Sequence, residues 1–431
     1  MRRRVVVTGM GVITPLGHSA SAMFAALLEG QSGIDLIRNF PATSFPTTFA
    51  SEVKNFHLRD FIKNAAQYAN AGSNTQFALS AAAQALADAN LLDTTGVDRT
   101  RIGVYMGCGE GGEDFATVMA GCASAVDEAG YKTDPVKFTA RAIELLHGAA
   151  EAELEMNTTP AHLAEEFDLC GPNFNCLTAC AASAQAIGEA TEMIRHGDAD
   201  LFVAGGSHSM IHPFGVTGFN LLTALSTRNE NFRTASRPFD ATRDGFVLGE
   251  GGGVVILEEL EHAKKRGATI YAELTGYGTT GDAHAMTDPH PTGRGAIQAM
   301  KDALKNAGIG AADLGYINAH GTSTPANDET ETLVLKGALG EHAYKIPVSS
   351  TKSMLGHLIA AGGVVELIIS ILAMRQNVLP PTINLHHPDP LCDLDYIPNT
   401  AREVKGIRHV ASNSFGFGGQ NITLIASRVE R

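Results

Sequence analysis

The sequence predicts an α/β fold built around a largely parallel sheet. Short β-branched runs alternate with alanine-rich helical stretches along the whole chain, which is the pattern of strands connected by helices. No linker rich in proline, glycine and serine divides the 431 residues, and no low-complexity tract interrupts them. We therefore expect the alternation to continue from one end of the chain to the other.

The first half of the chain opens with Val5–Val7, which we expect to be a buried strand. Its apolar run is too short for a signal peptide. The further expected elements are helix Ala20–Leu28, helix Thr75–Leu91, strand Ile102–Met106, helix Ala184–Ile194, strand Leu201–Gly205 and strand Gly253–Leu257.

A boundary is expected where the last of these strands gives way to the charged helix Glu258–Lys265. The alternation then restarts, and Leu274–Gly278 loosely echoes Val7–Gly11 with the same Thr-Gly-X-Gly pattern. One architecture used twice would explain the echo, so we divide the chain into residues 1–257 and residues 258–431. The expected elements of the second half are strand Ile270–Leu274, helix Gly293–Ala307, strand Leu314–Asn318, helix Asp328–Leu335 and a buried helix within Leu358–Met374.

Composition excludes several classes of function. The net charge of −14 disfavours binding to nucleic acid or to anionic lipid. The longest apolar stretch, Leu358–Met374, is shorter than a usual membrane span and contains Glu366, which favours a core helix. The six cysteines lack a CxxC pair, so we expect reduced thiols in the cytoplasm and no zinc site.

Cys180 is the cysteine placed for chemistry. It follows the strand-like run Asn173–Thr178 and precedes a helix of small residues that begins with Ala181. A thiol at a helix start meets unpaired amides and the helix dipole, which favour the thiolate. A thiolate is a nucleophile for acyl transfer.

Three further segments carry polar side chains beside strands or glycines. His320 follows a strand, Lys352 and His357 precede the buried helix, and Ser412–Gly419 forms a glycine loop with two phenylalanines. Taken singly, His320 could be a structural histidine, Lys352 a surface lysine or half of an ion pair, and the loop a plain turn.

Together with Cys180, these segments resemble the β-ketoacyl-acyl-carrier-protein synthases, most closely the elongating synthase II type. The resemblance extends over nearly the whole chain. It rests on Val7–Gly11, Thr178–Cys180, Leu225–Asn229, Arg243–Phe246, His320–Thr324, Lys352–Met354, Gly356-His357 and Asn413–Gly419. It implies the thiolase fold, in which two similar halves form a five-layer αβαβα sandwich. It also implies a homodimer and chemistry that needs no metal or nucleotide cofactor.

The resemblance assigns the chemical roles. Cys180 would accept the acyl group as a thioester, with the backbone amides of Cys180 and Phe417 as donors to the oxyanion. Neutral His320 and His357 would donate hydrogen bonds to the malonyl thioester as it loses carbon dioxide. Lys352 would pair with Glu366.

The remaining assignments support these groups. Asp328 and Glu331 would orient the histidine loop, and Thr322 and Thr324 would bind the phosphopantetheine arm, unless they only cap a turn. Phe417 would gate the acyl pocket. The further substrate-binding positions are Thr287, Phe415 and Glu110.

The chain departs from the family at several places. Lys63–Asn70 lacks the basic cluster that helps to dock an acidic carrier, and Glu110 stands where an apolar residue usually meets the acyl chain. Glu110 could instead turn into the dimer interface. Extra residues at 140–157 could cover the pocket mouth or extend the dimer contact, and Ala285 stands at a usual histidine position. The missing basic cluster implies either a less acidic dedicated carrier or a relocated basic patch, for which the candidates are Arg2–Arg4, Lys264–Arg266 and Arg402–Lys405.

These observations predict a 3-oxoacyl-[acyl-carrier-protein] synthase that extends a carrier-bound acyl chain by two carbons in fatty acid biosynthesis. Its partners would be an acyl carrier protein with phosphopantetheine and malonyl and acyl thioesters. The main alternative is a specialised or type II polyketide ketosynthase that acts on an unusual acyl chain. A non-catalytic chain-length-factor-like subunit is a weaker alternative, because such subunits usually lack the active cysteine that this chain has. A degradative thiolase would need a second catalytic cysteine near the C-terminus.

Overall fold

The computed structural model describes residues 2–92, 96–109, 115–127, 130 and 132–429. Ten of its strands form one sheet in the order β10-β9-β13-β14-β8-β1-β7-β6-β4-β5. The first half of the chain supplies β1 (Val5–Ile13), β4 (Ile102–Cys108), β5 (Asn173–Cys176), β6 (Leu201–His208) and β7 (Gly251–Glu259). The second half supplies β8 (Ala272–Gly281), β9 (Leu314–Asn318), β10 (Val348–Ser349), β13 (His409–Gly416) and β14 (Gln420–Ser427).

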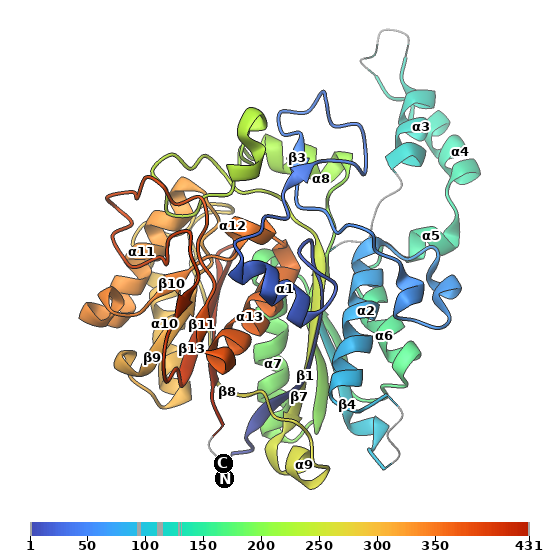
Figure 1. Cartoon of the computed structure of the whole chain (residues 1–431). Coiled ribbons are helices and arrows are strands. Elements are labelled where there is room, and N and C mark those ends of the chain that lie inside the picture. The colour runs from blue at the N-terminus through green and yellow to red at the C-terminus, as the bar shows by residue number, and fades with distance from the viewer. Residues whose placement is uncertain (1, 93–95, 110–114, 128–129, 131, 430–431) are drawn as a thin grey trace.

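Helices cover both outer faces and fill the space between the two groups of strands (Figure 1). Helices α2 (Ser73–Asp88) and α6 (Thr158–Phe167) pack on the first group, and α10 (Arg294–Ala307) and α11 (Pro325–Leu339) flank the second. Helices α7 (Ala182–His196) and α13 (Gly362–Gln376) lie in the middle and contact strands of both groups. The layers are thus the outer helices of the first half, the first group of strands, the central helices, the second group of strands and the outer helices of the second half. These are the five layers of the predicted αβαβα sandwich.

The repeat suspected from the sequence has a physical basis in helix packing. A Cβ atom on Gly11 of β1 would lie 2.0 Å from the carbonyl oxygen of Ala81 in α2. A Cβ atom on Gly278 of β8 would lie 1.9 Å from the carbonyl oxygen of Ala299 in α10. Each half uses glycine at this point because its outer helix approaches the strand backbone too closely for any side chain.

The expectation of a largely parallel sheet was wrong. Among the described strands, β4 pairs in parallel with β5 and β6, and β9 with β10 and β13, whereas all pairings of β1, β7, β8 and β14 are antiparallel. The predicted glycine loop is mostly strand, because β13 extends to Gly416 and turns directly into β14. Alternation along the chain does not reveal strand direction, because short hairpins and crossovers both separate strands.

The buried helix predicted within Leu358–Met374 is α13. Ile359–Gln376 is long and apolar enough to cross a membrane by composition, but 83% of this window is buried inside the protein. Among the described residues no other helix passes that test. The apolar character of α13 therefore fits a central core helix.

A two-helix arm projects from the body beside α2 (Figure 1). It consists of α3 (Phe115–Ala125) and α4 (Pro135–Leu145), and α5 (Gly148–Ala152) leads back to α6. The extra residues expected around 140–157 belong to this region. The remaining elements are α1 (Ala20–Leu28), β2 (Asp35–Leu36), β3 (Phe49–Ala50), α8 (Pro213–Leu221), α9 (Leu260–Lys265), α12 (Lys352–Leu355), β11 (Val378–Leu379) and β12 (Arg402–Glu403).

Candidate active site

Cys180 lies in a sharp turn between β5 and the central helix α7. Its neighbour Ala179 has a φ of 46°, a region that non-glycine residues rarely adopt. Ile359 has the same φ of 46° at the turn that leads into α13. The two halves thus enter their central helices in the same way, and in the first half this turn presents a thiol that is only 6% exposed.

The Cys180 thiol is not the thiolate that its helix-start position predicts. Burial raises the pKa of Cys180 to about 11, although the charge of Lys352 and the backbone N–H of Phe417 act in the opposite direction. The loss of water around the sulfur outweighs the local donors, so the resting group is a thiol. The sequence could not reveal this because burial comes from the tertiary structure.

His320 and His357 meet at Cys180. The cysteine Sγ and one ring nitrogen from each histidine lie within 4.8 Å of one another, and all three side chains are buried. The two rings are edge to face with centroids 5.3 Å apart. Burial first, and then the nearby Lys352 charge, hold the pKa of both histidines well below the usual value, so both imidazoles are neutral at pH 7.

The tautomer of His357 follows from its backbone contact. The Ile359 N–H donates to Nδ1 of His357 at 3.3 Å. A neutral imidazole whose Nδ1 accepts carries its proton on Nε2. This Nε2 is buried and has no hydrogen-bond partner among the described residues, so it is a free donor at the site.

A buried carboxylate holds the backbone of the His320 loop. Glu331 of α11 accepts hydrogen bonds from the backbone N–H groups of His320 at 2.8 Å and Gly321 at 2.7 Å, and from Asn413 Nδ2 at 3.1 Å. Asp328, one turn earlier, accepts from the backbone N–H groups of Phe239 and Ser323 at 2.9 and 3.2 Å. These contacts fit the orienting role predicted for Glu331 and Asp328.

Lys352 and Glu366 form the expected ion pair. Both side chains are almost fully buried, and Nζ of Lys352 contacts Oε1 of Glu366. Burial raises the pKa of Glu366 to about 7, although Lys352 acts to lower it. The cysteine and two histidines could in principle ligate a metal, but the ammonium of Lys352 beside them disfavours a cation.

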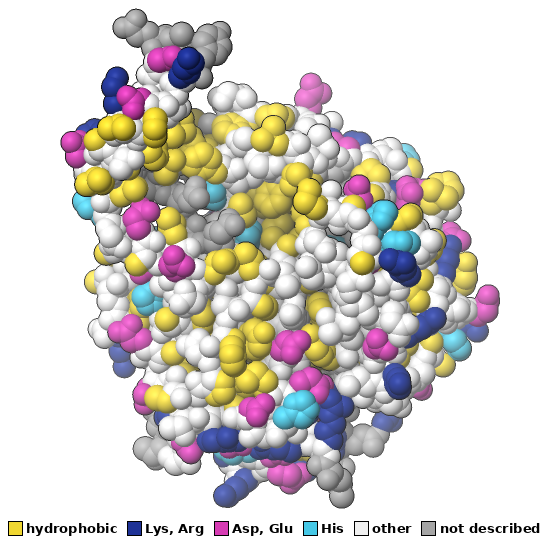
Figure 2. Space-filling model, turned by 180° about the vertical axis from the view of Figure 1, so that it is seen from behind, with side chains coloured by type: hydrophobic (Ala, Val, Ile, Leu, Met, Phe, Trp, Pro, Cys, Tyr) yellow, Lys and Arg dark blue, Asp and Glu magenta, His cyan; other side chains and the backbone are white. Residues whose placement is uncertain are grey.

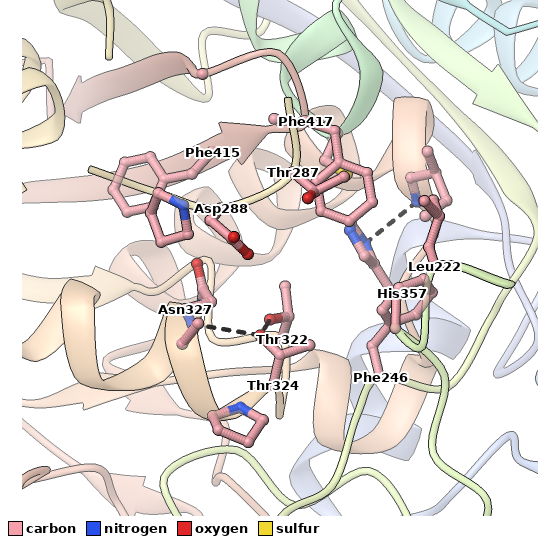
Figure 3. A pocket seen from close by; sticks show the side chains of 18 of the residues that line it. Leu222, Phe246, Thr287, Asp288, Thr322, Thr324, Asn327, His357, Phe415 and Phe417 are labelled. Atoms are coloured by element: carbon pink, nitrogen blue, oxygen red, sulfur yellow. Dashed lines mark hydrogen bonds between the residues drawn. The ribbon is translucent and has the colours of Figure 1, made fainter. Parts of the chain in front are cut away.

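An outer cavity of about 280 Å³ is lined by Cys180 and His357. Figure 3 shows His357 with other residues that line this cavity. The cavity is also lined by Thr322, Thr324, Thr287 and Phe415, for which the resemblance predicts substrate binding. The Thr322 and Thr324 hydroxyls are 2.9 Å apart. Thr324 also caps α11 by accepting from the Asn327 N–H at 3.4 Å, so the turn-capping alternative describes part of its role.

Phe417 also lines a second cavity, which we name the inner cavity. The inner cavity has a volume of about 300 Å³ and shares Phe417 and Ile359 with the outer cavity. Thr178 and Ala179, the residues just before Cys180, lie on its wall. The turn behind Phe417 contains Gly418 and Gly419 with φ values of 96° and 83°, which only glycine adopts readily.

Sequence reasoning missed several residues at these cavities. Phe246 packs edge to face on His357 with centroids 5.3 Å apart, and Asp288 and Asn327 line the outer cavity. His208 and Gln420 line the inner cavity. The position of His208 as the last residue of β6, at the edge where β4 and β5 also end, was a signal that could have found it.

Two further predictions concerned Glu110 and the candidate basic patches. Glu110 lies outside the described residues. The proposed basic patches are largely occupied by ion pairs, including Arg4 with Glu273, Arg266 with Glu258 and Arg402 with Asp395. The exposed residues that line the outer cavity are apolar, polar and acidic, and include Leu222, Thr287 and Asp288. Leu221 and Met286, which are next to lining residues in the sequence, are 80% and 85% exposed.

Comparisons with known proteins identify the family of the chain. Residues 2–263 match the family described as Beta-ketoacyl synthase, N-terminal domain, and residues 271–386 match Beta-ketoacyl synthase, C-terminal domain. The chain therefore belongs to the β-ketoacyl synthase family, as the sequence motifs predicted.

Within this family, the chain is similar over its full length to several curated proteins and solved structures. The chain is 46% identical to 3-oxoacyl-[acyl-carrier-protein] synthase 2 of Coxiella burnetii and 44% identical to the protein of the same name from Vibrio harveyi, in each case over 99% of both chains. Among solved structures, a ketosynthase complex with a type II polyketide acyl-carrier protein is similar, with a TM-score of 0.86, 34% identity and full coverage of both chains. A β-ketoacyl synthase from Burkholderia phymatum has a TM-score of 0.87 at 34% identity, covering 99% of this chain and all of that one.

Proposed function

We propose that this protein is a 3-oxoacyl-[acyl-carrier-protein] synthase that elongates carrier-bound acyl chains by decarboxylative condensation. The observation that carries the proposal is the buried cluster of Cys180, His320 and His357, of which Cys180 and His357 line the outer cavity. The full-length relatives that bear this activity in their names support it.

In the first step, Cys180 Sγ attacks the thioester carbonyl of the acyl carrier protein. The sulfur–acyl bond forms on Cys180, the pantetheine thiol leaves, and the cysteine proton passes to the departing sulfur. The backbone N–H groups of Phe417 and Cys180 both act to lower the pKa of the Cys180 thiol, and together these two amides can bind the developing oxyanion.

In the second step, a malonyl thioester enters past Thr322 and Thr324 and loses carbon dioxide. The electron pair of the broken carbon–carbon bond moves into an enolate, whose oxygen accepts a hydrogen bond from Nε2 of His357 and from His320. The enolate carbon then attacks the Cys180 thioester, a carbon–carbon bond forms, and the cysteine sulfur leaves. Neutral donors suit this step because they stabilise the enolate without protonating it.

We also propose a homodimer and a cytoplasmic location. The edge strand β5 ends the sheet with Phe174 44% exposed, and Val136 and Ile143 on the arm are 75% and 77% exposed. Figure 2 shows hydrophobic side chains gathered on the arm and on the neighbouring face of the body. A second copy would cover these apolar surfaces, and the six free thiols fit a reducing compartment.

The test is intact-protein mass spectrometry after incubation with an acyl-carrier-protein thioester, with wild type beside Cys180→Ala. We expect one acyl adduct on the wild type and none on the variant. Cys180→Gln should retain malonyl decarboxylation, and adding His320→Ala or His357→Ala should abolish it. Acylation of the Cys180→Ala protein would contradict the assignment, as would full decarboxylation without both histidines.

A further inference from the structure

The inner cavity carries polar groups that an alkyl chain cannot satisfy. This inference rests on the proposed function, because the inner cavity begins at the turn that holds Cys180 and would receive the acyl group bound there. Phe417 forms the wall toward the outer cavity, where the pantetheine arm would lie. The outer cavity would therefore hold the pantetheine arm of the carrier, and the inner cavity would hold the acyl chain.

His208 is the main polar group of this cavity. It is the last residue of β6 and is 3% exposed, and neither ring nitrogen has a hydrogen-bond partner among the described residues. The ring lies against Gly109, where a Cβ atom would come within 2.7 Å of Nδ1. Burial lowers the pKa of His208 to about 3, so the ring is neutral and offers one donor and one acceptor.

Gln420 adds a second unsatisfied group to the same wall. It is the first residue of β14, and its side-chain Oε1 is buried without a partner in the described part of the chain. A buried polar atom without a partner costs about 1–3 kcal/mol. A saturated chain in this cavity would leave all three atoms unpaired.

The position of His208 indicates which part of the chain these groups meet. Ile359, two residues after His357, lines the same cavity as His208. Ala179, next to Cys180 in sequence, lies on the same cavity wall. The polar groups therefore face the thioester end of a bound chain.

We propose that the inner cavity binds acyl chains that carry an oxygen substituent near the thioester, a carbonyl or a hydroxyl group, with His208 and Gln420 as its hydrogen-bonding partners. Such chains arise when a preceding condensation product is not fully reduced. The reaction that supplies this substrate is then an earlier condensation followed by no reduction or by reduction to the hydroxyl alone.

The test compares three carrier-bound chains of equal length: octanoyl, 3-oxooctanoyl and 3-hydroxyoctanoyl. The rate of adduct formation on Cys180 is measured by intact-protein mass spectrometry. We expect at least one oxygenated chain to load about tenfold faster than octanoyl or more, because one good hydrogen bond to a buried group is worth about that factor. The faster of the two oxygenated chains identifies the carbonyl or the hydroxyl as the preferred group.

Two variants remove the polar groups with little change in volume, His208→Leu and Gln420→Met. Each should reduce the preference for oxygenated chains, and the first should speed octanoyl loading. Met210→Leu, on the same cavity wall, changes shape without changing hydrogen bonding and should keep the preference. Thermal unfolding of each variant reports whether it folds. The comparison of the three acyl chains on the wild-type protein tests the inference even if a variant does not fold.

The failures are distinguishable. Equal or faster loading of octanoyl by the wild type would overturn this inference and leave the condensing activity intact. A preference for oxygenated chains that survives in both polar variants would also overturn it. No adduct from any of the three chains would overturn the proposed function and this inference together.

Discussion

Glu331 offers a quantitative test of how the histidine loop is held. Replacing it with alanine removes the acceptor of three buried donors, the N–H groups of His320 and Gly321 and the amide of Asn413, at 2.7 to 3.1 Å. Each buried donor left without a partner costs about 1–3 kcal/mol. The free energy of unfolding should therefore fall by roughly 3 kcal/mol or more, measured by urea denaturation.

Two companion variants make the test specific. Glu331→Gln keeps one acceptor oxygen, so its loss should be about half as large. Glu329→Gln, on the same helix, alters a carboxylate that is 44% exposed and pairs with Arg243, and should change stability by less than about 1 kcal/mol.

Measuring malonyl decarboxylation separates the effect of Glu331 on the position of His320 from its effect on the stability of the fold. At a temperature where Glu331→Ala is folded, malonyl decarboxylation should fall more than about tenfold, because His320 no longer has a fixed place, whereas acyl loading on Cys180 should persist. An unfolding free energy within about 0.5 kcal/mol of wild type, or unchanged decarboxylation, would refute this reasoning.

Three further outcomes are expected. Gly278→Ala should abolish folding or lower the melting temperature sharply, because its Cβ would lie 1.9 Å from a carbonyl oxygen, whereas Gly281→Ala in the same strand meets nothing within 4 Å and should be tolerated. Lys352→Met should cost about 3–5 kcal/mol of unfolding free energy at pH 8 by leaving a buried carboxylate unpaired, and adding Glu366→Gln should recover most of it. Burial raises the pKa of Glu250 to about 7, so denaturation of wild type beside Glu250→Gln should show a pH-dependent difference.

The sign of the Glu250 effect follows from its raised pKa. The folded protein binds this proton more tightly than the unfolded chain, whose carboxyl has a pKa near 4.5. The stabilisation is complete below that value and is lost as the pH rises through about 7, amounting to about 3 kcal/mol. Wild type should therefore lose stability relative to Glu250→Gln between pH 5 and pH 8, and a difference independent of pH would show that Glu250 is ionised throughout.

Local patterns predicted much of the fold because burial leaves a periodic trace. Helix Ala20–Leu28 and strand Leu314–Asn318 have the predicted bounds, and α7, α10 and α13 were each located by their apolar residues. Strand direction was not predicted. The antiparallel β13–β14 hairpin and the ladder of β1 with β7 depend on which strands meet in space, which alternation along the chain does not encode.

The candidate site also has features that the sequence predicted and features that it could not predict. Motif spacing was sufficient to name Cys180, His320, His357 and Lys352, because their chemistry depends on residue type and on a short flanking sequence. The ionisation of Cys180 was not predictable, since its pKa depends on how much water the folded protein excludes from the sulfur. For His208, the strand end was a signal of its position, but the cavity beside it is formed only by the folded structure.

The amino-acid sequence alone was enough to establish the family and the fold class, and it predicted the candidate nucleophile and a division into two halves. These are carried by residue identities and by repeated local patterns such as the glycines of Val7–Gly11 and Leu274–Gly278. Folding was needed to show the neutral state of the thiol and histidines, the two cavities that share Phe417, and the polar side chains that line the inner cavity. Desolvation and cavity shape arise from residues far apart in the chain, so they exist only once the two halves have packed together.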